Sequence, residues 1–288
     1  MADRIKNEVL AKYTTMKIGG PSEIISIPKN IDDLISEVMY CKEENIPYRI
    51  LGNGSNLLIS DKGIRGFVIK LNHACNSLKL IDKNKIKVGS GVRLQKFIRF
   101  AINNNLGGYE LLSSIPGTVG GAIYMNAGIG GKNNVLRCIS DYLISVEIFD
   151  GKEIVSLKKD KCEFGHRKSI FQKNPEWIIL SGLFELPFQE KKIGLQKIKE
   201  WMKYVMKNQD RRYACAGSIF CDDYSRITSF LMKGKRYGNA AFSLRNGNWI
   251  NNLGNAKFRD VIFLIKMAQC INYIFSFKKP SLEIRIWE

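Results

Sequence analysis

Apolar residues along the chain follow two spacings, one typical of strands and one typical of helices. Continuous or alternating apolar runs predict strands at 24–28, 47–51, 67–71, 78–81, 85–88, 140–149, 153–157, 178–186 and 281–287. Apolar positions that recur every three to four residues predict helices at 34–44, 95–103, 197–207 and 258–274. Asp32 or Asp33 is expected to cap the first helix, and residues 1–10 fit a short helix or a tail. The pattern predicts a fold that mixes helices and strands throughout.

Two glycine-rich stretches stand between apolar runs. The first, Gly52-Asn53-Gly54-Ser55-Asn56, follows a predicted strand but lacks the third glycine of a dinucleotide-binding fingerprint. The second, Ile115–Gly128, is interpreted as a buried turn and strand with a flat face of backbone amides. Such a face suits a large planar or diphosphate-bearing ligand, and a tightly packed core turn is the other interpretation. Together the two stretches indicate one phosphate-rich cofactor held by two loops.

Composition narrows the class of protein. The length of 288 residues suits one large or two modest domains, and 45% hydrophobic and 25% charged residues are ordinary for a globular protein. No apolar run approaches the ~18 residues of a membrane span, and the N-terminus lacks the apolar segment of a secretory signal. Seven cysteines without a C-x-x-C pair indicate reduced thiols in the cytosol. Because the only histidines are His73 and His166, no metal site is expected.

The net charge of +18 leaves two functional interpretations open beside a plain lysine-rich composition. A basic surface is typical of nucleic-acid-binding proteins, but the lysines are dispersed and no nucleic-acid-binding motif accompanies them. Positive potential also steers polyanionic ligands toward a site. A nucleic-acid-binding function would therefore rest on charge alone.

The two glycine stretches, together with the opening Tyr13-Thr14-Thr15-Met16-Lys17-Ile18-Gly19-Gly20-Pro21, resemble the UDP-N-acetylenolpyruvoylglucosamine reductase (MurB) family. This family belongs to the vanillyl-alcohol-oxidase-like FAD superfamily, and the chain looks like its shorter subclass. The resemblance implies an α+β fold. It implies a two-part FAD-binding (PCMH-type) domain over residues 1–200, with subdomains of about 1–72 and 73–200. A substrate-binding domain would cover 201–288, and its terminal strand would return to the active site.

The resemblance also implies FAD as cofactor and NADPH as electron donor. The residues expected to bind FAD are those of the two glycine stretches: Gly52, Asn53, Gly54, Ser55, Asn56, Ile115, Pro116, Gly117, Thr118, Gly120, Gly121, Asn126, Ala127 and Gly128.

Three residues match the positions that carry chemistry in the family. Arg167 follows His166, where the family usually has tyrosine, and its cation would pair with the substrate carboxylate and an enolate-like state. Ser218 lies in an A-G-S-x-F box and would protonate the substrate as general acid. Glu283, near the C-terminus, would orient or polarise the enolpyruvyl group. From the residues alone, a surface arginine, a turn serine and a solvated Glu–Arg face are the alternatives.

The chain departs from the family in the part expected to hold the nucleotide-sugar. Cys221-Asp222-Asp223 stands where Lys-Asn-Pro is usual, and Asn246 replaces a histidine. The two aspartates are expected to weaken binding of a diphosphate. Arg236 and Asn248 match family positions and are the expected substrate-binding residues.

The resemblance therefore implies a flavoenzyme that reduces UDP-N-acetylglucosamine enolpyruvate to UDP-N-acetylmuramate with NADPH. This reaction serves peptidoglycan precursor synthesis, and with it cell wall biogenesis, cell shape, the cell cycle and cell division. A cytoplasmic monomer without a nucleic-acid or membrane partner is expected. The alternative is a divergent paralogue that binds FAD but acts on another substrate or turns over poorly.

Overall fold

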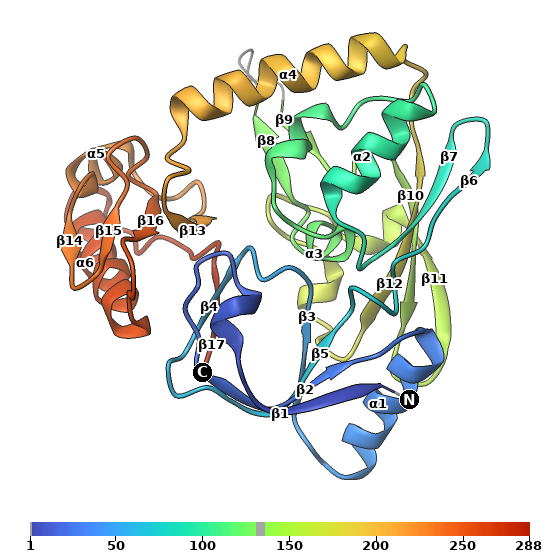
Figure 1. The fold of residues 1–288 in the computed structure, drawn as a ribbon. Coiled ribbons are helices and arrows are strands. Elements are labelled where there is room, and N and C mark those ends of the chain that lie inside the picture. The colour runs from blue at the N-terminus through green and yellow to red at the C-terminus, as the bar shows by residue number, and fades with distance from the viewer. Residues whose placement is uncertain (1, 131–135) are drawn as a thin grey trace. The chain divides into compact units, whose positions relative to one another are not determined.

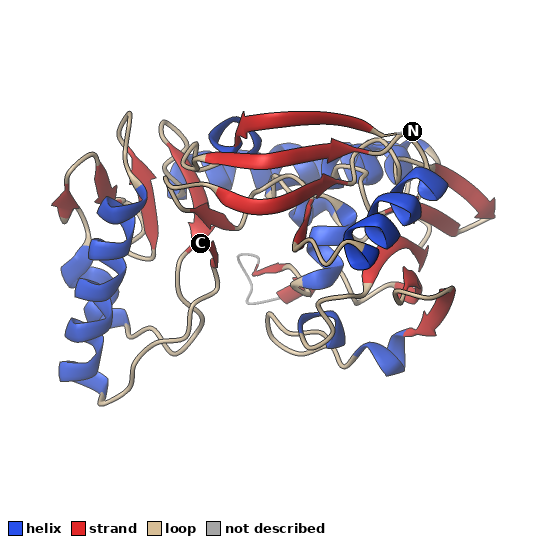
Figure 2. Ribbon diagram, turned by 90° about the horizontal axis from the view of Figure 1, so that it is seen from below, coloured by secondary structure: helices blue, strands red, loops and turns tan. Residues whose placement is uncertain are grey.

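The computed structural model describes residues 2–130 and 136–288, and helices and strands are interspersed along them (Figures 1 and 2). The chain divides into two compact units. The first comprises Met1–Ile5, Ile25–Asn53 and Phe67–Lys203, and the second comprises Lys6–Ile24, Gly54–Gly66 and Tyr204–Glu288. The division after Lys203 lies close to the expected boundary at residue 200, but the second unit also takes in two segments from the N-terminal part of the chain.

A five-stranded sheet of order β11-β10-β12-β7-β6 forms the centre of the first unit. Its strands are β6 (Leu78–Asp82), β7 (Lys85–Gly89), β10 (Leu143–Phe149), β11 (Ile154–Lys158) and β12 (Ile178–Glu185). Both predicted hairpins are present as antiparallel pairs. Helix α2 (Leu94–Asn103) packs in the same core, where the rings of Phe97 and Phe184 lie 4.9 Å apart.

A four-stranded sheet of order β1-β2-β5-β3 carries the first glycine stretch. Its strands are β1 (Asp3–Val9), β2 (Pro21–Ile27), β3 (Tyr48–Leu51) and β5 (Ile64–Lys70). The expectation of a helix or tail for residues 1–10 is wrong. Strand β1 is exposed along nearly its whole length, so it shows no apolar alternation, and it forms because its backbone pairs at the edge of the sheet.

Helix α1 (Ile31–Glu43) begins one residue before the position expected for its cap. Asn30, rather than Asp32 or Asp33, is the N-cap, and its side-chain oxygen accepts a hydrogen bond from the Asp33 N–H at 2.8 Å. The short 3-10 segments are η1 (Leu10–Tyr13), η2 (Glu110–Ser114), η3 (Lys159–Cys162) and η4 (Ile170–Gln172), and strands β8 (Gly128–Gly130) and β9 (Leu136–Cys138) form a small antiparallel pair.

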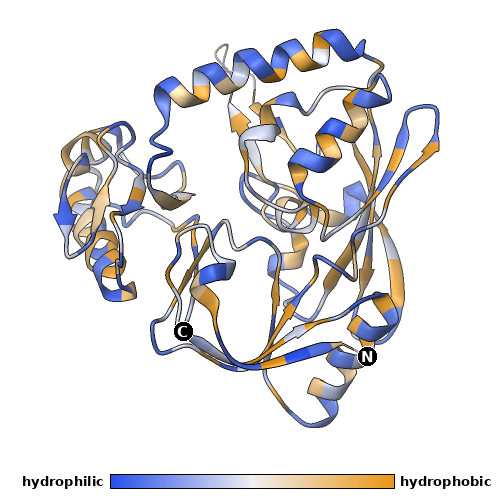
Figure 3. Ribbon diagram, in the orientation of Figure 1, coloured by the Kyte–Doolittle hydropathy of each residue, from blue (hydrophilic) through white to orange (hydrophobic). Residues whose placement is uncertain are grey.

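Helix α4 (Lys191–Asn208) is longer than the predicted 197–207, and hydrophilic and hydrophobic positions alternate along it (Figure 3). Trp201 is buried, and its indole N–H donates to the Ser114 hydroxyl at 3.1 Å. The division between the two units falls within this helix.

The second unit contains a four-stranded sheet of order β13-β16-β15-β14. Its strands are β13 (Ala214–Ser218), β14 (Arg236–Tyr237), β15 (Ala240–Phe242) and β16 (Trp249–Asn252). Helices α5 (Arg226–Met232) and α6 (Phe258–Ser276) share its apolar core. Strand β4 (Leu57–Ile59) pairs in parallel with β17 (Arg285–Trp287), which is shorter than the predicted 281–287.

In the part of the chain that the structure describes, no helix is both long and apolar enough to cross a membrane. The same residues contain no group of three or more His, Cys, Asp or Glu side chains arranged to hold a metal ion.

Candidate active site

The two glycine stretches meet in the first unit. The parallel pairing of β3 with β5 ends at Leu51, so the chain turns at Gly52 directly toward the second stretch. A Cβ atom added to Gly52 would lie 2.7 Å from the Thr118 hydroxyl, and the Asn53 side-chain amide donates to the Pro116 carbonyl. Only glycine at position 52 allows the two loops to approach this closely.

The second stretch forms a helix where a strand was expected, so that part of the prediction is wrong. Helix α3 (Val119–Tyr124) begins at Thr118, whose hydroxyl accepts a hydrogen bond from the Gly121 N–H at 3.3 Å. Its two glycines disfavour helix intrinsically. The helix forms because Val119, Ala122 and Ile123 are buried at helical spacing, and Gly120 lies against Ser90, where a Cβ would be 2.6 Å away.

Gly121 differs from the glycines around it. It is exposed, and a Cβ there would meet only the Thr118 hydroxyl, at 3.5 Å. The packing of the chain itself therefore does not require glycine at this position. A bare backbone at an exposed helix start is what the close approach of a ligand would require, so this loop fits FAD.

The other half of the first glycine stretch belongs to the second unit. Gly54 has a φ of +59°, and a Cβ there would lie 2.2 Å from the Tyr13 carbonyl oxygen. The Thr15 N–H donates to the Gly54 carbonyl at 3.2 Å. The opening motif from Tyr13 to Pro21 thus packs directly on the first glycine stretch, which gives a physical reason for the two motifs to occur together.

Arg167 lies in a tight turn that is fixed to the end of the second glycine stretch. Gly165 and Lys168 exchange backbone hydrogen bonds of 3.1 and 3.2 Å, and Arg167 between them has a φ of +55°. The Gln172 amide donates to the Arg167 carbonyl at 3.0 Å and to the Tyr124 carbonyl at 2.9 Å. The Asn126 amide donates to the Gly165 carbonyl at 2.9 Å. The structure therefore brings Arg167 to the expected FAD loop.

Asn126 supplies a second observation that fits a bound ligand. Its side chain is buried, and its Oδ1 atom accepts no hydrogen bond from any residue in the described ranges. A buried acceptor without a donor is costly. The cost is removed if a ligand bound between the loops donates an N–H group to this oxygen.

Two cations beside the loops were missed by the sequence analysis. Lys70 pairs with Leu51 at the last register position before Gly52, and Arg93 forms an isolated bridge with Thr118. Burial lowers the pKa of Lys70, and the charge of Arg93 lowers it further. Two cations near the glycine loops suit a diphosphate. The sequence showed only that Lys70 stands near the end of the predicted 67–71 strand, because the parallel pairing of this strand with 47–51 appears only in the structure.

Ser218 lies at the end of β13, where the strand is irregular. The β13–β16 register shifts between Cys215 and Ser218, and Gly217 has a φ of +77° with no atom within 4 Å of an added Cβ. Such irregularities re-aim side chains and are common beside active sites. Ser218 is half-buried, and its hydroxyl makes no hydrogen bond within the described part of the chain. This leaves the hydroxyl available to a substrate.

Glu283 lies next to this serine segment although the two are far apart in sequence. The Glu283 N–H donates to the Ile219 carbonyl at 2.9 Å. On its other side, the Asn56 amide donates to the Glu283 carbonyl at 2.9 Å, and the Arg285 N–H donates to the Asn56 carbonyl at 3.0 Å. The structure therefore brings Ser218, Glu283 and the end of the first glycine stretch together within the second unit.

The expected substrate-binding residues lie apart from each other. Asn248 is adjacent to the Ser218 segment, where its side chain bonds the backbone of Phe220. Arg236 is exposed on β14, at the opposite edge of the sheet from β13, and its guanidinium bonds the Gly238 carbonyl at 2.9 Å. A substrate contact for either residue stays a prediction.

Asp223, one of the residues expected to weaken anion binding, has a structural partner. Its carboxylate accepts hydrogen bonds from the Ser281 N–H at 2.8 and 2.9 Å and from the Ser281 hydroxyl at 2.6 Å. The Cys221 N–H donates to the Ser281 carbonyl at 2.9 Å. Asp223 therefore anchors the segment that leads to Glu283.

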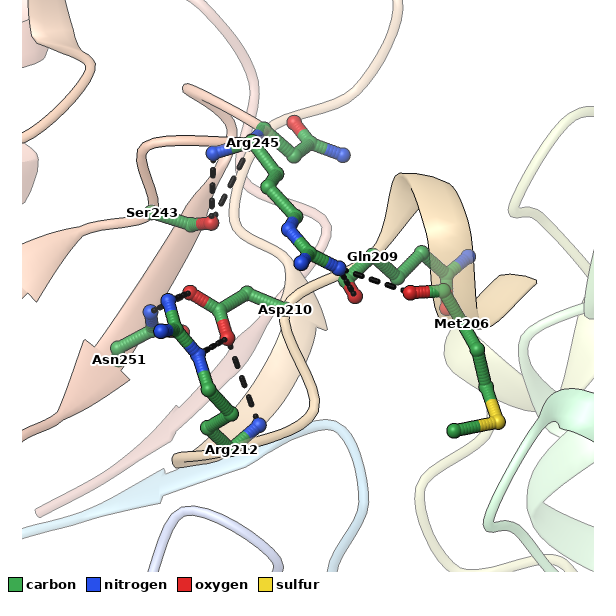
Figure 4. Close-up of polar contacts among 8 residues, drawn as sticks. Met206, Gln209, Asp210, Arg212, Ser243, Arg245 and Asn251 are labelled. Carbon is green, nitrogen blue, oxygen red and sulfur yellow. Dashed lines mark hydrogen bonds and ion pairs between the residues drawn. The ribbon is translucent and has the colours of Figure 1, made fainter. Parts of the chain in front are cut away.

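A buried carboxylate fixes the start of β13. Asp210 is 2% exposed and accepts two hydrogen bonds from the Arg212 guanidinium, at 2.9 and 3.0 Å, one from the Arg212 N–H at 3.4 Å, and one from the Asn251 amide at 3.5 Å (Figure 4). Arg245 donates to the Met206 and Gln209 carbonyls at 2.8 and 3.1 Å, which satisfies carbonyls at the end of α4. The pKa of Asp210 is held below its ordinary value, chiefly by the hydrogen bonds from Arg212.

Asp210→Asn is expected to lower the free energy of unfolding at pH 7 by about 1–3 kcal/mol, the usual range for hydrogen bonds to a charged group. Because the folded-state pKa is depressed, the stabilisation is fully present above the unfolded pKa of about 4 and is lost as pH falls through the folded pKa. Urea unfolding should therefore show a difference between variant and wild type that shrinks below pH 4. Asp3→Asn, which breaks an exposed pair with Lys29, should change little. An equal difference at all pH values would contradict the assignment.

The chain is similar to known proteins both in sequence and in structure. Residues 22–156 match the family model described as FAD binding domain, a range that contains both glycine stretches. The chain is 36% identical over 268 residues to UDP-N-acetylenolpyruvoylglucosamine reductase 1 of Bacillus cereus strain ATCC 14579, covering 91% of this chain and 87% of the relative. It is 34% identical over 267 residues to UDP-N-acetylenolpyruvoylglucosamine reductase of Bacillus subtilis strain 168, covering 91% and 86%.

The crystal structure of UDP-N-acetylenolpyruvylglucosamine reductase (MurB) from Thermus caldophilus matches with a TM-score of 0.81 and 31% identity, covering 100% of this chain and 99% of that chain. These similarities confirm the α+β fold class and FAD as the cofactor. The roles of individual residues stay predictions.

Proposed function

Because the chain belongs to the UDP-N-acetylenolpyruvoylglucosamine reductase family, whose members are FAD-dependent oxidoreductases, we propose that it reduces UDP-N-acetylglucosamine enolpyruvate to UDP-N-acetylmuramate with NADPH. This is the reaction expected from the sequence motifs. It places the protein in peptidoglycan precursor synthesis. The observation that supports the proposal most directly is the hydrogen bond from the Glu283 N–H to the Ile219 carbonyl, because it brings the Glu283 and Ser218 segments together.

Bound FAD supplies the two-electron transfer between NADPH and the enolpyruvyl group. The residues that hold it are those of the two glycine stretches, which meet at Gly52 and Thr118. Gly121 offers an exposed backbone, and Lys70 and Arg93 add positive charge beside the loops. The loops therefore offer the exposed backbone and the nearby positive charge that suit a flavin dinucleotide.

Ser218 supplies the proton that completes reduction of the substrate double bond. A serine hydroxyl is a weak acid in water, so the developing alkoxide has to be stabilised by its surroundings. The Glu283 N–H donates to the carbonyl of Ile219, the residue after Ser218. Glu283 orients the enolpyruvyl group beside the Ser218 hydroxyl. Arg167 pairs with the substrate carboxylate and stabilises negative charge as it develops.

The departures from the family do not favour the alternative of a paralogue with another substrate. Asp223 serves as an anchor for Ser281, so its carboxylate is already hydrogen-bonded to two donors, the Ser281 N–H and hydroxyl. Asn246, which replaces a histidine, accepts a hydrogen bond from the Asn248 N–H at 2.9 Å. Both changes are accommodated within the second unit.

The visible spectrum of the purified protein tests the proposal. We expect flavin absorbance that bleaches on anaerobic addition of NADPH and returns on addition of UDP-N-acetylglucosamine enolpyruvate. Absorbance that bleaches but does not return with this substrate would reject the proposed reaction while keeping the flavoprotein. A protein that neither contains nor binds FAD would reject both.

A further inference from the structure

The side-chain amide of Asn248 brackets the backbone of Phe220, two residues after Ser218. The Phe220 N–H donates to Asn248 Oδ1 at 2.9 Å, and Asn248 Nδ2 donates to the Phe220 carbonyl at 2.9 Å. The Asn248 backbone carbonyl accepts a third hydrogen bond, from the Ile219 N–H, also at 2.9 Å. One residue therefore binds three of the four backbone polar groups of Ile219 and Phe220.

The β13–β16 pairing does not extend to Ile219 and Phe220, so it does not hold these residues in place of the Asn248 contacts. The register shift between Cys215 and Ser218 interrupts the β13–β16 ladder just before the serine, and the ladder resumes only at the single pair Ser218 and Trp249, where the strand ends. Gly217 on its other side has positive φ and no close neighbours, so it places little steric constraint on the serine. The position of Ser218 consequently depends on its pairing with Trp249 at the strand end and on what holds Ile219 and Phe220, which is Asn248 from one side and Glu283 from the other.

Asn248 is itself held rigidly. Asn246 Oδ1 accepts its N–H at 2.9 Å, and the Tyr224 hydroxyl donates to the Gly247 carbonyl at 3.1 Å. A Cβ at Gly247 would lie 1.7 Å from the Ser229 carbonyl oxygen, so the turn packs against α5 in a way that only glycine permits. The residue that replaces the family histidine thus supports Asn248 directly.

We propose that Asn248 is a positioning residue, which holds the Ser218 hydroxyl in place for proton transfer and does so through the backbone of Phe220. The inference rests on the proposed role of Ser218 as the proton donor. It assigns the Asn248 amide to the protein backbone, where a substrate contact was the expectation from sequence.

Asn248→Ala removes both side-chain hydrogen bonds and leaves the Phe220 N–H and carbonyl without these partners. We expect the rate at which substrate reoxidises the reduced flavin to fall by about 10- to 100-fold, as for a misplaced catalytic group. Flavin reduction by NADPH should be unchanged, and the Kd for the UDP-sugar should change less than about twofold. A direct substrate contact would instead raise Kd and leave the reoxidation rate at saturation nearly unchanged.

Asn252→Ala is the matched control, because Asn252 lies on β16 and also uses its amide to bond backbone groups. Its side chain donates to the Met16 carbonyl at 2.9 Å and accepts from the Gly254 and Ala256 N–H groups at 2.9 and 3.1 Å. This control should lower thermal stability without the selective loss of reoxidation. If both variants lose reoxidation equally, the effect is general destabilisation and the proposal is overturned.

Hydrogen exchange of the Ile219 and Phe220 amides provides a readout that does not depend on turnover. Asn248→Ala should accelerate exchange at Phe220, and Asn252→Ala should not. Unchanged protection at Phe220 would overturn the positioning role. If wild type fails to reoxidise with the UDP-sugar while exchange changes as expected, the proposed reaction fails and the structural part of this inference stands.

Discussion

Ser218→Ala is expected to lower product formation by about 10²- to 10⁴-fold, the range for removing a general acid, while the flavin is still reduced by NADPH at the wild-type rate. The expectation follows from the position of the hydroxyl at an irregular strand end, with the Glu283 segment bonded to the next residue. Stopped-flow absorbance measures the two half-reactions separately. Reduction by NADPH requires no proton from Ser218, so only the reoxidation by substrate should slow.

The control for this substitution is Ser276→Ala. That hydroxyl donates to the Asn272 carbonyl at 2.7 Å and accepts from the Asn272 amide at 2.8 Å, both within its own helix, so its removal deletes a serine of the same unit whose hydrogen bonds do not involve the β13 segment. It should leave both half-reactions unchanged. Reoxidation of Ser218→Ala at the wild-type rate would remove Ser218 from the proton-transfer step.

Gly54→Ala is expected to yield a protein that does not retain FAD. The alanine would be held at φ +59° and its Cβ would lie 2.2 Å from the Tyr13 carbonyl oxygen, so the loop cannot keep its conformation. Strain of this kind costs on the order of 1–3 kcal/mol before the steric clash is added. The measurement is the ratio of flavin to protein absorbance after purification, together with the Kd for added FAD.

Two further alanine substitutions distinguish a specific loss of FAD binding from general destabilisation of the protein. A Cβ at Gly130 would meet no atom of the described residues within 4 Å, so Gly130→Ala should leave FAD binding and thermal stability unchanged. Gly121→Ala should also leave the stability of the apoprotein unchanged, because its Cβ meets only Thr118 at 3.5 Å, but it should weaken FAD binding. Wild-type FAD affinity in both Gly54→Ala and Gly121→Ala would mean that the flavin binds elsewhere.

Segments with strong local patterning were predicted well from the sequence. The helix at 95–103 and the hairpins at 78–88 and 140–157 appear at nearly the predicted bounds, because their apolar spacing and turn residues are local properties. The two glycine stretches were predicted to be ligand loops from the same kind of local signal. Glycines interleaved with apolar residues indicate close backbone packing wherever they occur.

The predictions that were wrong concern segments whose conformation depends on tertiary contacts. Residues 119–124 form a helix despite two glycines, because their apolar face is buried and Ser90 lies where a side chain would clash. Strand β1 forms because its backbone pairs at the edge of the sheet, and its sequence shows no apolar alternation that would predict a strand. In both cases the deciding partner lies elsewhere in the chain.

The sequence by itself determined the fold class and the cofactor through its resemblance to the reductase family, and the same resemblance marked the two glycine stretches, Arg167, Ser218 and Glu283 as candidates. Only the tertiary structure decided that Glu283 is bonded to Ile219 and that Asn248 brackets Phe220. A hydrogen bond to the backbone of a distant segment has no signature in the side chains of that segment. They form because burial of both segments leaves their polar groups no other partner, and that is a property of the folded chain.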